Sequence, residues 1–97
     1  MLPVIFHEFT QNELNEAAAY YAQARPGLGE AFIVEVEQAV AALAAAPHAG
    51  AEVESGVRWW LVKRFPYSVL YRLHDDQIRV LAIAHQKRRP FYWQGRR

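Results

Sequence analysis

The sequence predicts an α+β protein in which a helical hairpin packs on a sheet. Two observations carry this prediction: apolar residues recur at helical spacing in the first half of the chain, and with a period of two in the second half. The chain has 97 residues, a length that fits one hydrophobic core better than two. We therefore expect a single domain over residues 1–97, with the element order β-α-α-β-β-β and a basic tail over residues 86–97.

The chain is expected to begin with a strand and a helix. Residues 2–7 are apolar and partly β-branched, as in a short strand. The segment Thr10-Gln11-Asn12-Glu13 has the form of a capping box, in which Thr10 and Glu13 would satisfy free backbone N–H groups at the start of a helix. We expect this helix to end near Arg25, because Pro26 disfavours helical geometry at the residue before it.

A second and longer helix is expected over residues 28–46. Phe32, Val36 and Val40 lie on one helical face, and glutamates lie between them in the sequence. Pro47 ends this helix, and its short connection to the first helix predicts an antiparallel hairpin. Residues 49–55 are expected to form an irregular link.

The second half of the chain predicts three strands. Aromatic and β-branched residues alternate over residues 57–65, 67–73 and 77–85, with Pro66 and the polar turn 73–77 between them. Such short connections predict an antiparallel meander. The middle of the third strand is apolar on both faces, as is typical of a central strand.

The two halves of the chain carry opposite charge. Residues 1–55 contain one arginine and eight glutamates, a net charge of −7, whereas residues 56–97 contain ten lysines and arginines and two aspartates, a net charge of +8. One interpretation is that the halves attract each other within one domain. The other is that the basic half offers a face to phosphate or to an acidic partner.

Several classes of protein are not supported by the sequence. The absence of cysteine excludes disulfides, a thiolate nucleophile and a zinc ribbon, and it favours a reducing compartment. No basic leader and no apolar run of about 20 residues is present, so we expect a cytoplasmic protein with no membrane segment. The four histidines are scattered, and no phosphate-binding or dinucleotide-binding glycine motif occurs, so no metal or other cofactor is expected.

Beside this reading of the residues stands a resemblance to a known family. The order of elements and several strings along nearly the whole chain resemble the RelE/ParE toxins of type II toxin–antitoxin systems. The strings are Asn12-Glu13-Leu14-Asn15-Glu16-Ala17, Tyr20-Tyr21, Arg25-Pro26-Gly27-Leu28-Gly29, Gly56-Val57-Arg58, Phe65-Pro66-Tyr67-Ser68-Val69-Leu70-Tyr71-Arg72, Ile78-Arg79-Val80-Leu81-Ala82-Ile83-Ala84-His85 and Arg88-Arg89-Pro90-Phe91-Tyr92-Trp93.

The resemblance implies a fold, a partner and a target. It implies a curved antiparallel sheet packed against the helical hairpin, with the toxic face on the sheet and tail. It also implies a cognate antitoxin that wraps the toxin in a hetero-oligomer, and a homo-oligomer is an open alternative. Family members of the RelE type cut mRNA on the ribosome, whereas those of the ParE type poison DNA gyrase.

A RelE-type ribonuclease would need an acid, a base and cations at the scissile phosphate. By their positions in the motifs, Arg72, His85, Arg88 and Tyr92 resemble the residues that such enzymes use. Each also has a structural interpretation: Arg72 could pair with a helix glutamate, His85 could be a hydrogen-bonding group at a strand end, and Tyr92 could pack the tail on the sheet.

The string from His85 to Trp93 is more similar to the ParE type, and bulky Trp59-Trp60 stands upstream of Lys63 and Arg64. Gyrase inhibition, which is not an enzymatic activity, is therefore the first hypothesis. Ribosome-dependent mRNA cleavage is the second, and a plain nucleic-acid-binding module is the third. The residues predicted to contact the target are Arg58, Trp60, Lys63, Arg64, Lys87, Arg88, Arg89 and Trp93.

Overall fold

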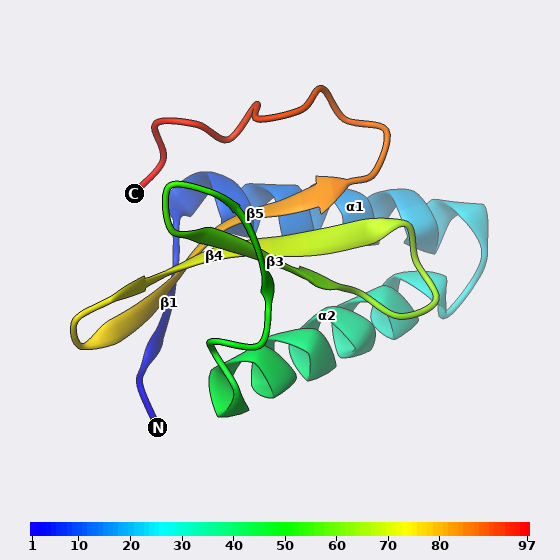
Figure 1. Ribbon diagram of the computed structural model, residues 1–97. Helices are drawn as coiled ribbons and strands as arrows, with labels where there is room; N and C mark the ends of the chain where they lie inside the picture. Colours follow the sequence, from blue (N-terminus) through cyan, green and yellow to red (C-terminus); the bar gives the residue numbers. More distant parts are fainter.

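A computed structural model describes residues 1–97 as two helices on one face of a five-stranded sheet, with the C-terminal segment on the other face (Figure 1). The strand order is β1-β5-β4-β3-β2. No helix has the length and apolar character that crossing a membrane requires. The elements are β1 (Val4–Phe6), α1 (Glu8–Ala24), α2 (Leu28–Ala45), β2 (Ala51–Glu54), β3 (Val57–Leu61), β4 (Tyr67–His74) and β5 (Gln77–His85).

The sheet contains the predicted meander and two further features. Strands β3, β4 and β5 pair antiparallel, as expected. Strand β1 pairs with β5 in parallel, so the sheet is mixed and not wholly antiparallel. The link expected over residues 49–55 contains strand β2, which pairs antiparallel with β3. This strand was not predicted because all four of its residues are exposed at the sheet edge, so burial does not alternate along it as it does in a half-buried strand.

The capping box expected at Thr10 and Glu13 is wrong. Helix α1 starts at Glu8, and His7 is its N-cap, with the Nδ1 atom accepting a hydrogen bond of 3.1 Å from the Phe9 N–H. Thr10 lies inside the first turn, fully buried, and its hydroxyl donates to the carbonyl of Val80 on β5 at 3.2 Å. The Thr10 side chain, which the local pattern assigned to capping, therefore forms a tertiary hydrogen bond instead.

The helical hairpin is confirmed and closes through a glycine-bearing turn. Gly27 adopts a φ of 82°, in the left-handed region that glycine enters without strain. Gly29 allows the close approach of the helices, since a Cβ atom there would lie 2.5 Å from the carbonyl oxygen of Ala18. The hairpin packs on the sheet through a core that includes Phe32, Leu43 and other apolar side chains of both layers.

A second, smaller core lies on the opposite face of the sheet. It contains Val57, Leu70, Leu81, Ala82 and Trp93, the last of these from the C-terminal segment. This cluster explains why the middle of β5 is apolar on both faces, as the sequence predicted. The register shifts between Leu70 and Tyr71, which pair with Ala82 and Val80, and so leaves Leu81 as an extra residue in a β-bulge.

Candidate target-binding surface

The tail, residues 86–97, crosses the face of the sheet that the helices leave free. It has no regular structure and proceeds by turns, and Trp93 fixes it to the sheet because its side chain is only 7% exposed within the second core. Phe91 has a positive φ of 60° and is 43% exposed, with its ring centroid 5.8 Å from that of Trp93. One aromatic residue of the tail is thus an anchor and a neighbouring one faces solvent.

Glu13 holds the tail to α1. Its carboxylate accepts hydrogen bonds from the Tyr92 hydroxyl at 2.6 Å, the Arg96 guanidinium at 2.9 Å and the backbone N–H of Ile83 at 3.2 Å. The side chains of Glu13 and Arg96 are each 14% exposed, so this ion pair is largely shielded from water. The carboxylate therefore joins the first helix, strand β5 and the tail at one point, a role that the sequence analysis missed.

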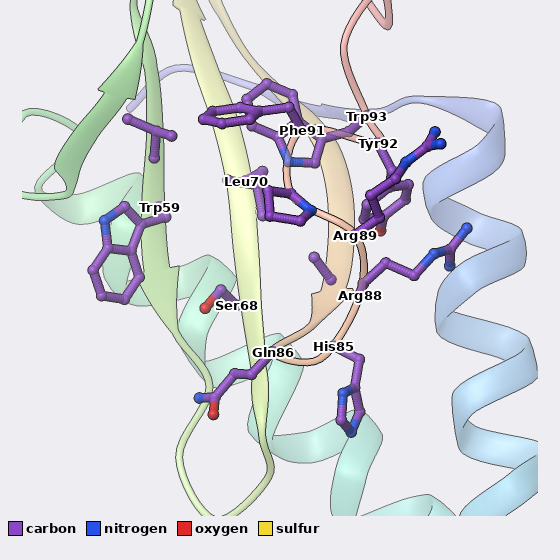
Figure 2. A pocket seen from close by; sticks show the side chains of 13 residues that line it. Trp59, Ser68, Leu70, His85, Gln86, Arg88, Arg89, Phe91, Tyr92 and Trp93 are labelled. Carbon is purple, nitrogen blue, oxygen red and sulfur yellow. The ribbon is translucent and has the colours of Figure 1, made fainter.

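A groove lies between the tail and strands β3 and β4. Figure 2 shows Trp59 on the wall formed by β3, with Arg88 and Tyr92 on the side nearest α1. Its lining is mixed, with apolar side chains at the base and cations at the rim. The lining residues are Val53, Trp59, Ser68, Leu70, Ala84, His85, Gln86, Arg88, Arg89, Pro90, Phe91, Tyr92 and Trp93.

Arg88 and Tyr92 stack on each other beside the groove. The Arg88 guanidinium carbon lies 4.0 Å from the centre of the Tyr92 ring, which is a cation–π contact. Burial raises the pKa of the Tyr92 phenol above its ordinary range, and the hydrogen bond to Glu13 and the charge of that carboxylate raise it further. Tyr92 is therefore a protonated donor that already has an acceptor, and it orients Arg88.

His85 lies at the end of β5, where its Nδ1 atom accepts a hydrogen bond of 3.0 Å from the backbone N–H of Lys87. Its ring packs edge-on against Tyr67, with the centroids 5.0 Å apart. One ring nitrogen is thus committed to the turn that starts the tail. His85, Arg88 and Tyr92 all line the groove.

Arg72 lies apart from these three residues. It pairs in register with Arg79, whereas His85 pairs with Tyr67 at the other end of the β4–β5 ladder. Five residues of strand separate Arg72 from Tyr67, a distance of roughly 17 Å at about 3.4 Å per residue. The Arg72 guanidinium donates to the carbonyl of Ser55 at 3.0 Å and has no helix glutamate as a partner.

The remaining predicted contact residues lie toward the helical side. Arg58 donates to the carbonyls of His48 and Gly50, at 3.2 and 2.7 Å, and Arg64 forms an ion pair of 3.6 Å with Glu35 of α2. Trp60 and Lys63 line a small hollow against α2. Trp59 packs against the second core and Trp60 against the main core, so the two side chains lie on opposite faces of the sheet, and both are half-buried.

The structure holds no group of three or more His, Cys, Asp or Glu side chains that could bind a metal ion. The groove lining offers cations, aromatic rings and hydrogen-bond donors. Such a surface suits the recognition of an anionic or aromatic partner.

Comparisons with known proteins agree with this architecture. A family model described as the ParE toxin of the type II toxin–antitoxin system parDE matches residues 4–90. Toxin ParE2 of Mycobacterium tuberculosis, found in two strains, is 31% identical over 85 residues, which are 87% of this chain and 81% of the relative. A solved chain from the chromosomal ParDE system of P. aeruginosa has the same fold, with a TM-score of 0.78 and 20% identity over 88% of this chain and 96% of that one. This chain belongs to the ParE toxin family of type II toxin–antitoxin systems.

Proposed function

We propose that this toxin stops bacterial growth by poisoning DNA gyrase, and that a cognate antitoxin neutralises it. Membership of the ParE family supports the proposal, since the resemblance implies gyrase as the target of ParE-type toxins. The observation that carries the choice between gyrase and mRNA is the separation of Arg72 from the group formed by His85, Arg88 and Tyr92.

The ribonuclease site that the RelE resemblance implies would have these four residues around one phosphate. Arg72 and His85 lie near opposite ends of the same ladder, roughly 17 Å apart along the strand, so they cannot contact one phosphate together. The Tyr92 hydroxyl donates to Glu13 and its pKa is raised, so the phenol stays protonated near neutral pH and does not act as a base. The arrangement favours a toxin that binds its target without cutting RNA.

The contact surface that we propose is the rim of the groove. Arg88 is oriented by Tyr92, and Lys87 and Arg89 are exposed beside it. Trp93 holds the segment on the sheet, so binding would not have to order a loose tail. Trp59 adds a half-buried aromatic side chain on the opposite wall.

Purified toxin should block supercoiling by gyrase, or trap its cleaved DNA, without cutting mRNA on translating ribosomes. The two measurements separate the hypotheses because hydrolysis of RNA and trapping of a topoisomerase leave different products. Cleavage of mRNA in the ribosomal A site, with gyrase unaffected, would establish the second hypothesis instead.

Two matched double variants locate the contact surface. Arg88→Ala with Arg89→Ala removes two charges from the groove rim, while Lys63→Ala with Arg64→Ala removes two from the helical side. We expect the first variant to lose growth inhibition and to melt within a few degrees of the parent, because exposed charges add little stability. The second should remain toxic. The reverse pattern would place the contact surface next to α2.

Co-expression with the adjacent antitoxin gene should restore growth. Because the second half of the chain carries a net charge of +8, association with an acidic antitoxin should slow as salt is added. Growth that continues in cells containing folded toxin alone would contradict the proposed function.

A further inference from the structure

The end of the sheet farthest from His85 carries a pocket of basic side chains, which we call the arginine pocket. Its lining consists of Arg72, His74, Gly95, Arg96 and Arg97, with no acidic and no apolar side chain among them. Arg79 is the cross-strand partner of Arg72, and so lies beside it on the same face of the sheet. Four arginines of β4, β5 and the tail thus gather at one place.

Main-chain carbonyls hold two of these arginines in position. Arg72 donates to the carbonyl of Ser55 at 3.0 Å, and Arg79 donates to the carbonyl of Arg97 at 2.6 Å. The amide carbonyl of Ser55 orients the Arg72 guanidinium without cancelling its charge. Each guanidinium has five N–H donors, so most of its donors stay available to a ligand.

Only one arginine of this pocket forms an ion pair with an acidic side chain. Arg96 pairs with Glu13, whereas Arg72, Arg79 and Arg97 have no carboxylate of an acidic side chain within 4 Å. Like charges placed directly opposite each other on a sheet are unfavourable. Arg72 is therefore held in one orientation with no acidic side chain to neutralise it, and the nearby arginines disfavour this arrangement, which an anionic ligand would relieve.

We propose that the arginine pocket binds the phosphodiester backbone of duplex DNA, with Arg72 as the main phosphate ligand and Arg79 and Arg97 adding positive charge. Guanidinium groups match phosphate oxygens in geometry and charge. No Phe, Tyr or Trp lines the pocket and His74 is its one aromatic ring, so it offers little platform for stacked, single-stranded bases and suits a backbone. The choice of DNA over other polyanions rests on the proposed function, because gyrase acts on duplex DNA.

This site is distinct from the groove rim. The pocket lies at the Arg72–Arg79 end of the ladder, while Arg88 and Arg89 line the groove beside His85. One toxin could thus contact gyrase through the rim and the bound DNA through the pocket. Because no base is read, binding should be independent of sequence and steeply dependent on salt.

Fluorescence anisotropy with a short labelled duplex DNA and the full chain, in the absence of gyrase, tests the proposal. We expect Arg72→Gln with Arg79→Gln to lower the affinity about tenfold or more, and to reduce the salt slope by about one to two. The matched control is Arg25→Gln with Lys63→Gln, which removes the same charge from exposed positions outside the pocket. The control should change the affinity less than about threefold.

Equal losses in the two variants would overturn the proposal, because net charge alone would then explain binding. Tighter binding of a single-stranded RNA of the same length would also overturn it, as would a parent protein that does not bind duplex DNA at low salt. If the pocket variant does not fold, the test uses the parent protein alone. Inorganic phosphate should then raise the Tm of the parent more than chloride does at equal ionic strength. An equal Tm in the two salts would refute the pocket. Gyrase assays are separate, so either proposal can fail alone.

Discussion

The carboxylate of Glu13 is the attachment point of the tail, and replacing it with an amide should release the tail. The change Glu13→Gln keeps the size of the side chain and removes its charge. Three donors now converge on this group: the Tyr92 hydroxyl, the Arg96 guanidinium and the N–H of Ile83. An amide has only one acceptor atom, so at least one of these donors would lose its partner.

The size of the effect follows from the burial of the pair. Removing one partner of a fully buried ion pair costs about 3–5 kcal/mol, and an exposed pair is worth less than about 1 kcal/mol. With both side chains 14% exposed, the pair formed by Glu13 and Arg96 lies near the buried limit. We therefore expect a loss of about 2–4 kcal/mol, which corresponds to a fall in Tm of roughly 10–25 °C for a domain of this size.

Thermal melting followed by circular dichroism measures this change, and Glu16→Gln is the matched control. Glu16 is exposed on the same helix and forms no ion pair, so its replacement should alter Tm by only a few degrees. Limited proteolysis should cut the Glu13→Gln protein within residues 86–97 first. Equal melting of the two variants, with the tail still protected, would refute the role of Glu13 as the anchor.

Three further outcomes are expected. Gly29→Ala should lower the unfolding free energy by about 1–3 kcal/mol in chemical denaturation, because its methyl group would meet the backbone of α1. The pKa of Tyr92 in the folded protein lies above the ordinary value of 10.0. Its contribution to stability is therefore complete below about pH 10 and is lost as the pH rises through the folded pKa. Above about pH 10 the Tm of Tyr92→Phe should decline less steeply than the Tm of the parent. Trp59→Ala and Trp60→Ala should each lower Tm by several degrees, because each side chain packs against a core, but only Trp59→Ala, which changes the groove wall, should weaken growth inhibition beyond the loss of folded protein.

Periodicity predicted the helical hairpin and the meander because these elements each bury one face against a single core. It failed for β2, whose four residues are all exposed, and for the parallel pairing of β1. Strand β2 pairs with its neighbour β3 across the short turn at Ser55 and Gly56, whereas β1 pairs with β5, which lies far away along the chain. No pattern of side chains within the segment itself records such a partner.

The misassignment of Thr10 and Glu13 has a similar physical origin. A capping box and a tertiary network draw on the same residue types, because both need a hydroxyl and a carboxylate near the first turn of a helix. Here the hydroxyl of Thr10 reaches Val80 and the carboxylate of Glu13 reaches the tail. Local pattern could identify these as hydrogen-bonding groups, but their partners are about 70 to 80 residues away along the chain.

The candidate site was predictable in its residue types and only partly in its geometry. Motif order brought His85, Arg88 and Tyr92 to one groove, because they follow one another at the end of a strand. It did not reveal that Arg72 lies at the other end of the ladder, since that depends on the pairing of β4 with β5. Arg79 was overlooked for the same reason.

The ion pairs support the first interpretation of the opposite charges of the two halves and leave other cations without an acidic partner. All three ion pairs join a glutamate of residues 1–55 to an arginine of residues 56–97, so the halves do attract each other within the fold. These pairs occupy only Arg58, Arg64 and Arg96, however, and the other seven cations have no carboxylate of an acidic side chain within 4 Å. Except for Lys63, those unpaired cations lie on β4, β5 and the tail: Arg72, Arg79, Lys87, Arg88, Arg89 and Arg97. Attraction between the halves therefore accounts for the cations that hold the structure together, and the surplus on the sheet and tail is the part that binding to a partner has to explain.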